Sequence, residues 1–168
     1  MPSPIRPTDD DARALARDLM GASLHAALGV IEDGTPMVTR IAFATGPDAE
    51  PLSLISDLSA HTRALIANPA CSLLIGEPGA KGDPLTHPRL TLRCHATLIR
   101  HGAPHYEKLA AHYLHRQPKA KLYIGFADFS ICRFDVSAGF LNGGFGKAFE
   151  MTPADLAADL AADLARRS

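Results

Sequence analysis

Hydrophobic and polar residues alternate along much of the chain, in short runs that predict β-strands. The clearest run is Arg89 to Arg100, where one face carries Leu90, Leu92, Cys94, Ala96 and Leu98. A pair of strands, about Leu24 to Val30 and about Met37 to Thr45, flanks Asp33-Gly34, a dipeptide typical of hairpin turns. Further strands are predicted at Leu52 to Ser56, Cys71 to Gly76, Phe129 to Val136 and near Phe140.

Four other segments show the spacing of helices. The first covers about residues 9 to 20, with Thr8 as its expected cap. One helix is predicted from a cap at Ser59 to about Asn68, and another from about Pro104. The last covers about residues 153 to 167.

The order of these elements predicts a single domain over residues 1–168. With 46% hydrophobic residues in 168, the chain can bury a core. Strands that follow one another with few helices between them favour a mainly β (α+β) fold. We expect an antiparallel sheet closed into a barrel, with the helices at its periphery.

Charge and composition narrow the possible partners. Seventeen basic and eighteen acidic residues give a net charge of −1, which argues against a nucleic-acid partner. No apolar run approaches the ~20 residues of a membrane helix, and no secretory signal is visible. The three cysteines, Cys71, Cys94 and Cys132, form no C-x-x-C pair. We therefore expect a cytoplasmic protein whose thiols pack as small apolar groups.

The segment from Ile55 to Arg63 carries the most informative chemistry. A strand ends, a tight turn follows and a helix begins, so unpaired N–H groups and the positive end of the helix dipole meet at one place. Hydroxyl or guanidinium donors stand there at Ser56, Ser59, Thr62 and Arg63. Arg40 could reach the same place from the neighbouring strand. These are the parts of a phosphate site.

A plainer interpretation stays open at this point. Ser59 could do no more than cap its helix, and Arg40 could pair with an acidic residue at the surface.

Two segments give the chain a family resemblance. The residues from Leu54 to Leu58 and from His61 to Leu65, followed by Asn68-Pro69, resemble the flavin-phosphate segment of the pyridoxamine 5′-phosphate oxidase-like FMN-binding split barrels. Asn142-Gly143-Gly144-Phe145-Gly146-Lys147-Ala148 resembles the Gly-Gly-Phe-Gly-basic-Ala signature of the haem-utilisation branch. The resemblance covers roughly Asp11 to Met151.

This resemblance implies a six-stranded antiparallel split barrel that forms a homodimer, with FMN at the subunit interface and a small-molecule substrate. Four residues fall where the family contacts the FMN phosphate region: Arg40, Ser56, Thr62 and Arg63. His61 lies in the same motif, nearer to ribityl or phosphate than to the redox centre. Lys147 falls where the glycine-rich segment presents a basic group to the pocket. Without the resemblance, those glycines equally suit a mobile loop.

The sequence departs from both characterised activities of the superfamily. The vitamin-making oxidases carry an Arg-x-His pair in their C-terminal strand, where this chain reads Phe140-Leu141-Asn142. The haem-degrading relatives use a histidine near the C-terminus as iron ligand, and no histidine follows His115 here. These differences argue against vitamin B6 synthesis and against haem ligation in the manner of those relatives. Flavin binding requires neither the Arg-x-His pair nor the C-terminal histidine.

The sequence therefore predicts an FMN-binding oxidoreductase acting on an unidentified small molecule, with no catalytic acid or base assigned. Two alternatives remain: a haem-binding or haem-degrading iron-utilisation protein, and a non-enzymatic module that binds flavin or another phosphate-bearing ligand. No metal site is expected. The histidines at 105, 112 and 115 share a helical stripe with Lys108 and so suit a solvated face.

Overall fold

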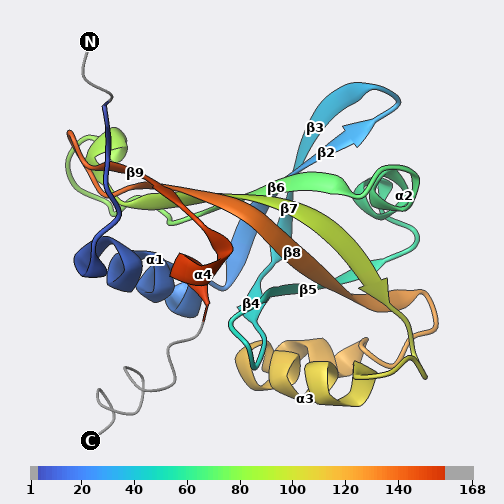
Figure 1. Ribbon diagram of the computed structural model, residues 1–168. Helices are drawn as coiled ribbons and strands as arrows, with labels where there is room; N and C mark the ends of the chain where they lie inside the picture. The colour runs from blue at the N-terminus through green and yellow to red at the C-terminus, as the bar shows by residue number, and fades with distance from the viewer. Residues whose placement is uncertain (1–3, 158–168) are drawn as a thin grey trace, which may run out of the picture.

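The computed structural model describes residues 4–157 (Figure 1). Its strands are β1 (Ile5–Arg6), β2 (His25–Glu32), β3 (Thr35–Ala42), β4 (Ala44–Thr45), β5 (Pro51–Ser56), β6 (Ala70–Ile75), β7 (Arg89–Ile99), β8 (Phe129–Asn142) and β9 (Ala148–Met151). Its helices are α1 (Asp10–Ala22), α2 (Ala60–Ala67), α3 (Tyr106–Arg116) and α4 (Pro153–Leu156), with single 3₁₀ turns at Pro84–Thr86 and Pro118–Leu122. The fold is mainly β, as the sequence predicts.

The strands form one sheet in the order β1-β9-β8-β7-β6-β2-β3, while β5 pairs with β8 along the same edge as β9, and β4 pairs with β5. All pairs are antiparallel except β1 with β9. No ladder joins β3 to β5 within residues 4–157, so the barrel is split. The expectation of a closed barrel was wrong, while the split barrel implied by the resemblance is confirmed.

Residues 4–157 form nine strands, whereas the residue pattern predicts seven and the resemblance implies six. The strands β1 and β4 have two residues each and β9 has four, too few for an alternating pattern to reveal them. The two predicted strands at 129–136 and near Phe140 are one strand of fourteen residues, β8. A bulge explains the apparent break, because the register with β7 shifts between Arg93 and Cys94 and leaves Ser137 unpaired.

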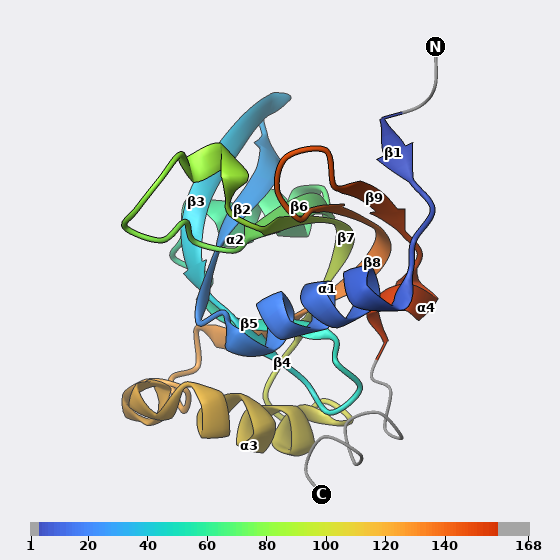
Figure 2. The same ribbon diagram turned by 90° about the vertical axis from the view of Figure 1, so that its left-hand side faces the viewer.

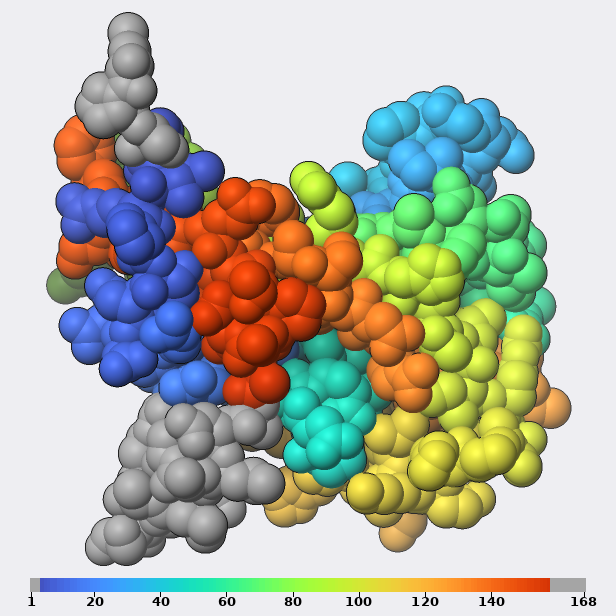
Figure 3. Space-filling model, in the orientation of Figure 1, coloured from blue at the N-terminus to red at the C-terminus, as the bar shows by residue number. Residues whose placement is uncertain are grey.

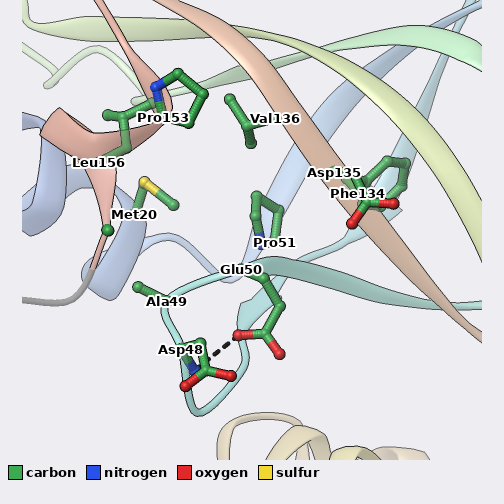
Figure 4. Close-up of a pocket in the computed structure, with 11 residues that line it drawn as sticks. Met20, Asp48, Ala49, Glu50, Pro51, Phe134, Asp135, Val136, Pro153 and Leu156 are labelled. Atoms are coloured by element: carbon green, nitrogen blue, oxygen red, sulfur yellow. Dashed lines mark hydrogen bonds between the residues drawn. The ribbon is translucent and has the colours of Figure 1, made fainter.

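One edge of β8 is shared by two partners. Residues 129–133 pair with β5 and residues 139–142 pair with β9. Between them, residues 134–138 have no strand on that side in the described part of the chain. A pocket of about 240 Å³ opens there, with Pro51 and Pro153 on its walls and the carboxylates of Asp48 and Glu50 at its rim (Figure 4).

Two hydrophobic cores hold the fold together. In the first, α1 lies across the open side of the curved sheet (Figure 2) and buries Ala12, Ala16 and Met20 against it. In the second, α3 packs its apolar face, including the fully buried Tyr113, beneath β4 and β5. β7 serves both cores, because its alternating face enters the first and Ile99 at its end enters the second.

The three cysteines lie in the first core. Burial raises the pKa of Cys71 to about 12 and raises the pKa of Cys94 and Cys132 further. They pack as protonated, apolar groups, as the sequence predicts.

Several local signals act differently from the prediction. Asp9, not Thr8, caps α1 by accepting a hydrogen bond from the N–H of Ala12, while the Thr8 hydroxyl donates to the carbonyl of Glu150. The helix predicted from Pro104 begins at Tyr106, since His105 adopts a left-handed conformation. The helix predicted over about residues 153 to 167 begins as α4 but stops at Leu156, because Ala157 adopts an extended conformation; the remainder of the predicted helix lies outside the described residues. None of the helices in residues 4–157 is long and apolar enough to cross a membrane.

The predicted hairpin is confirmed. Asp33 and Gly34 both have positive φ, at 48° and 77°, which gives the turn between β2 and β3 the twist that a two-residue hairpin requires. The space-filling view shows this hairpin projecting from the body of the molecule (Figure 3).

Candidate functional site

A pocket of about 340 Å³ lies where β3 and β5 part, beside the N-terminus of α2. It is lined by Arg40, Ile41, Ala42, Leu54, Ile55, Ser56, Ser59, His61, Tyr123 and Phe129. Three of the six predicted site residues, Arg40, Ser56 and His61, are therefore brought together.

The pocket follows from the split in the barrel. Ile41 and Ile55 belong to the first core and Leu54 to the second, so the pocket opens at the seam between the two cores. Because the pocket lies at a free edge of β3, side chains from both faces of the strand can reach its neighbourhood. A ligand here would also meet backbone groups that no neighbouring strand satisfies.

Arg40 is exposed and pairs across the sheet with Ala27, whose short side chain leaves the guanidinium uncovered. No acidic residue among those described forms an ion pair with it. The alternative that Arg40 only pairs with a surface acid is not what the structure shows. An unpaired guanidinium on a pocket wall is suited to a carboxylate or phosphate.

The two serines differ in what they can offer. The Ser56 hydroxyl donates to Oδ2 of Asp128 at 2.5 Å and accepts from the N–H of Leu58 at 3.1 Å, so its proton is already committed. Ser59 is at the N-cap of α2, but its side chain makes no capping bond. The hydroxyl best placed to donate to an anion is therefore that of Ser59.

His61 is half-buried on the first turn of α2. Its Nδ1 lies 3.2 Å from Oγ1 of Thr39. Burial lowers the pKa of His61, so its ring is neutral near pH 7. The ring's other nitrogen, Nε2, has no hydrogen-bond partner among residues 4–157.

Thr62 and Arg63, predicted to contact a phosphate, do not line the pocket. The Thr62 side chain is completely buried, and its hydroxyl has no hydrogen-bond partner within the described residues. Arg63 is exposed and donates from Nη1 to the carbonyl of Leu58 at 2.7 Å. In this structure Arg63 holds the turn before α2, and Thr62 packs beneath it.

Lys147 lies at the other end of the molecule. Phe129, the first residue of β8, pairs with Ser56 at the pocket, whereas Asn142, the last, pairs with Ala148 beside Lys147. These ends are roughly 40 Å apart along the strand, and α2 and β9 stand on opposite sides of the molecule (Figure 1). Lys147 and Arg40 of one chain do not reach the same pocket.

Sequence reasoning missed the aromatic wall made by Tyr123 and Phe129. Their ring centroids are 5.0 Å apart, and both line the pocket. The pairing of Phe129 with Ser56 places the aromatic residue beside the predicted motif. A pattern in one segment could not show this, because the two residues are 73 apart in the sequence.

The histidines of α3 do not gather with other ligands. Within residues 4–157, no group of three or more His, Cys, Asp or Glu side chains could hold a metal ion. His112 and His115 are exposed, in keeping with a solvated face.

Residues 17–141 match the family model described as pyridoxamine 5′-phosphate oxidase. The chain belongs to this family. The match covers the whole of the pocket at β3, β5 and α2, and the resemblance inferred from the sequence is confirmed.

Haem proteins are among the relatives. The non-canonical heme oxygenase HOZ of Arabidopsis thaliana is 32% identical over 103 residues, which are 61% of this chain but only 30% of that protein. A heme binding protein from Mycobacterium smegmatis is 27% identical, with a TM-score of 0.78 over 90% of this chain and 61% of that one. A third solved structure is 44% identical, with a TM-score of 0.81, and covers 91% of this chain and 99% of that chain. This chain thus spans less than two thirds of either haem protein.

Proposed function

We propose that this protein binds haem in the pocket between β3, β5 and α2. The observation that carries the proposal is that one pocket is lined both by Arg40, which has no ion-pair partner among residues 4–157, and by the neutral imidazole of His61. The similarity to two haem proteins supports it.

The donor set fits this ligand class. A haem carries carboxylates on one edge of a flat apolar ring. Arg40 would bind a carboxylate, with the Ser59 hydroxyl as a second donor, and Tyr123 and Phe129 would pack against the ring and exclude water. When bound, haem supplies electron-transfer and oxygen chemistry, which the protein directs through access and polarity.

FMN is the second candidate, in a flavoprotein oxidoreductase. The specific observation in its favour is that Arg40 and the uncapped Ser59 meet the N-terminus of α2 at the pocket, which is the chemistry of a phosphate site. The family match supports this candidate as well. A module that binds flavin without turnover would show the same spectrum but no oxidation of a reduced nicotinamide.

We further propose that the protein works as a homodimer in the cytoplasm. Val38 on β3 and Leu74 on β6 are 70% and 45% exposed, and both flank the short side chains of β2. A second copy covering this face would remove apolar surface from water. Lys147, remote from the pocket of its own subunit, could act only in another copy's pocket. Light scattering of the purified protein tests the dimer.

An absorbance titration tests the cofactor. The purified protein is mixed with haem, and separately with FMN, and each is followed through gel filtration. An intense Soret band that travels with the protein supports haem. Twin flavin bands that persist while haem washes away would replace the haem proposal with the flavoprotein one, and loss of both ligands would end both.

A further inference from the structure

His61 presents an imidazole with one engaged and one free nitrogen to the pocket. Nδ1 lies within hydrogen-bond distance of the Thr39 hydroxyl, at 3.2 Å, while Nε2 has no partner in the described part of the chain. If Nδ1 carries the proton and donates it to Thr39, Nε2 keeps its lone pair. Histidines that bind metals commonly have this arrangement, because a hydrogen bond on the far nitrogen fixes the tautomer and the ring orientation.

No other described histidine is placed to serve the pocket. His101 is tied by Nε2 to the carbonyl of Phe126 at 3.2 Å and lies against Tyr106. His25 lines a different pocket, 3.7 Å from Glu77. His95 is exposed on β7, where it pairs with Ala70 and Asp135 across the sheet.

Building on the proposed function, we propose that Nε2 of His61 is the axial ligand of the haem iron, and that Thr39 is its positioning residue. The half-buried ring lines the pocket and is fixed on its Nδ1 side by Thr39, which leaves Nε2 for the iron. Thr39 faces the interior side of β3, opposite to Arg40, because it pairs with the fully buried Leu28. The imidazole of His61 is thus held from the core side of β3, while Arg40 would hold the anion from the surface side.

The test compares His61→Ala and His61→Gln with the wild-type protein, with His95→Ala as the exposed-histidine control. Each is loaded with ferric haem and examined by absorbance and electron paramagnetic resonance. Wild type and His95→Ala should show the signature of a histidine ligand. Both His61 variants should lose that signature, and added imidazole should restore it to His61→Ala.

Thr39→Val tests the positioning role, because it keeps the shape of the side chain and removes the hydroxyl. Haem should still bind through His61, with affinity lowered about 10- to 100-fold, as is typical when the partner of a metal-binding histidine is removed.

The two proposals fail in different ways. A wild-type protein without a Soret band would end the haem proposal and this inference with it. A wild-type Soret band together with an unchanged ligand signature in His61→Ala, or one that imidazole does not restore, would overturn the His61 assignment alone.

Discussion

The hydroxyl of Ser56 donates a hydrogen bond of 2.5 Å to Oδ2 of Asp128, so a carboxylate stands directly behind a wall of the pocket. The bond ties the end of β5 to the start of β8, where the N–H of Asp57 also donates to the carbonyl of Asp128 at 2.8 Å. The negative charge of the Asp128 carboxylate repels any anion bound beside Ser56.

Asp128→Asn should therefore raise the affinity for an anionic ligand by a few-fold. The amide oxygen can still accept the Ser56 proton, while the repulsive charge is removed. Binding of haem or FMN is measured by titration at low and high salt, and the gain should shrink at high salt. Asp48→Asn, at the separate pocket of Figure 4, is the control and should leave the affinity unchanged. Equal affinity in Asp128→Asn and wild type would contradict this account.

Arg40→Ala should weaken ligand binding by about 1.5–3 kcal/mol, the usual range for a hydrogen bond to a charged group. Arg40→Lys should recover only part of the loss, because an ammonium cannot bind a carboxylate or phosphate in two-pronged fashion. Equilibrium titration gives the affinities, and Arg133→Ala, which removes a partly buried arginine paired with Asp135 away from the pocket, is the control. Full affinity in Arg40→Ala would show that the anion binds elsewhere.

Thr62→Val should stabilise the protein by ~1 kcal/mol, since it removes a buried hydroxyl that lacks a partner and keeps the side-chain shape. Thr62→Ser should do the opposite, because it keeps the hydroxyl and loses a packed methyl group. Urea unfolding gives both values. Because Thr62 does not line the pocket, ligand affinity should not change in Thr62→Val. A marked loss of affinity would show that Thr62 does contact the ligand.

The unfolding free energy should depend on pH through His61. Its pKa in the folded protein is lowered by burial, so the unfolded chain takes up a proton on His61 at a higher pH than the folded one. The stabilising contribution is therefore complete above about pH 6.5, the pKa of the unfolded chain, and is lost as the pH falls through the lower folded value. Between about pH 8 and about pH 5 the wild type should lose more stability than His61→Gln. If the unfolding free energies of the two proteins changed with pH in parallel, this role of His61 would be disproved.

Local patterns predicted the frame of the fold well. The alternation in β7 named the residues that face the first core, and Asp33-Gly34 fixed the hairpin, because both signals depend on neighbouring residues alone. The bulge at Ser137 depends on the register of β8 against β7, and the left-handed conformation of His105 is not visible in the residue spacing, so the pattern misplaced the break in β8 and the start of α3.

The site was predicted only in part, because the outcome depends on how α2 is rotated about its own axis. Spacing identified the strand-turn-helix segment but not which helix face packs on the sheet. Thr62 and Leu65, three residues apart, share the buried face, which leaves His61 beside the pocket and Arg63 in solvent. An apolar residue three positions after Thr62 was the available signal. The contact of Ser56 with Asp128, and of Phe129 with the motif, requires the fold itself.

Lys147 shows the limit of carrying a motif from family to chain. The glycine-rich segment resembles the family signature, yet β8 separates it from Arg40 within one chain. A family motif identifies a residue type, while the chain's own topology decides which pocket it can enter.

The stretch of β8 at residues 134–138, between β5 and β9, leaves backbone amides that a foreign strand could recruit. Three features make such recruitment difficult: the bulge at Ser137 interrupts the regular spacing, Asp135 places a charge on the rim, and Pro51 and Pro153 crowd the approach (Figure 4). These features protect the part of β8 between β5 and β9 against strand pairing with a second copy of the chain.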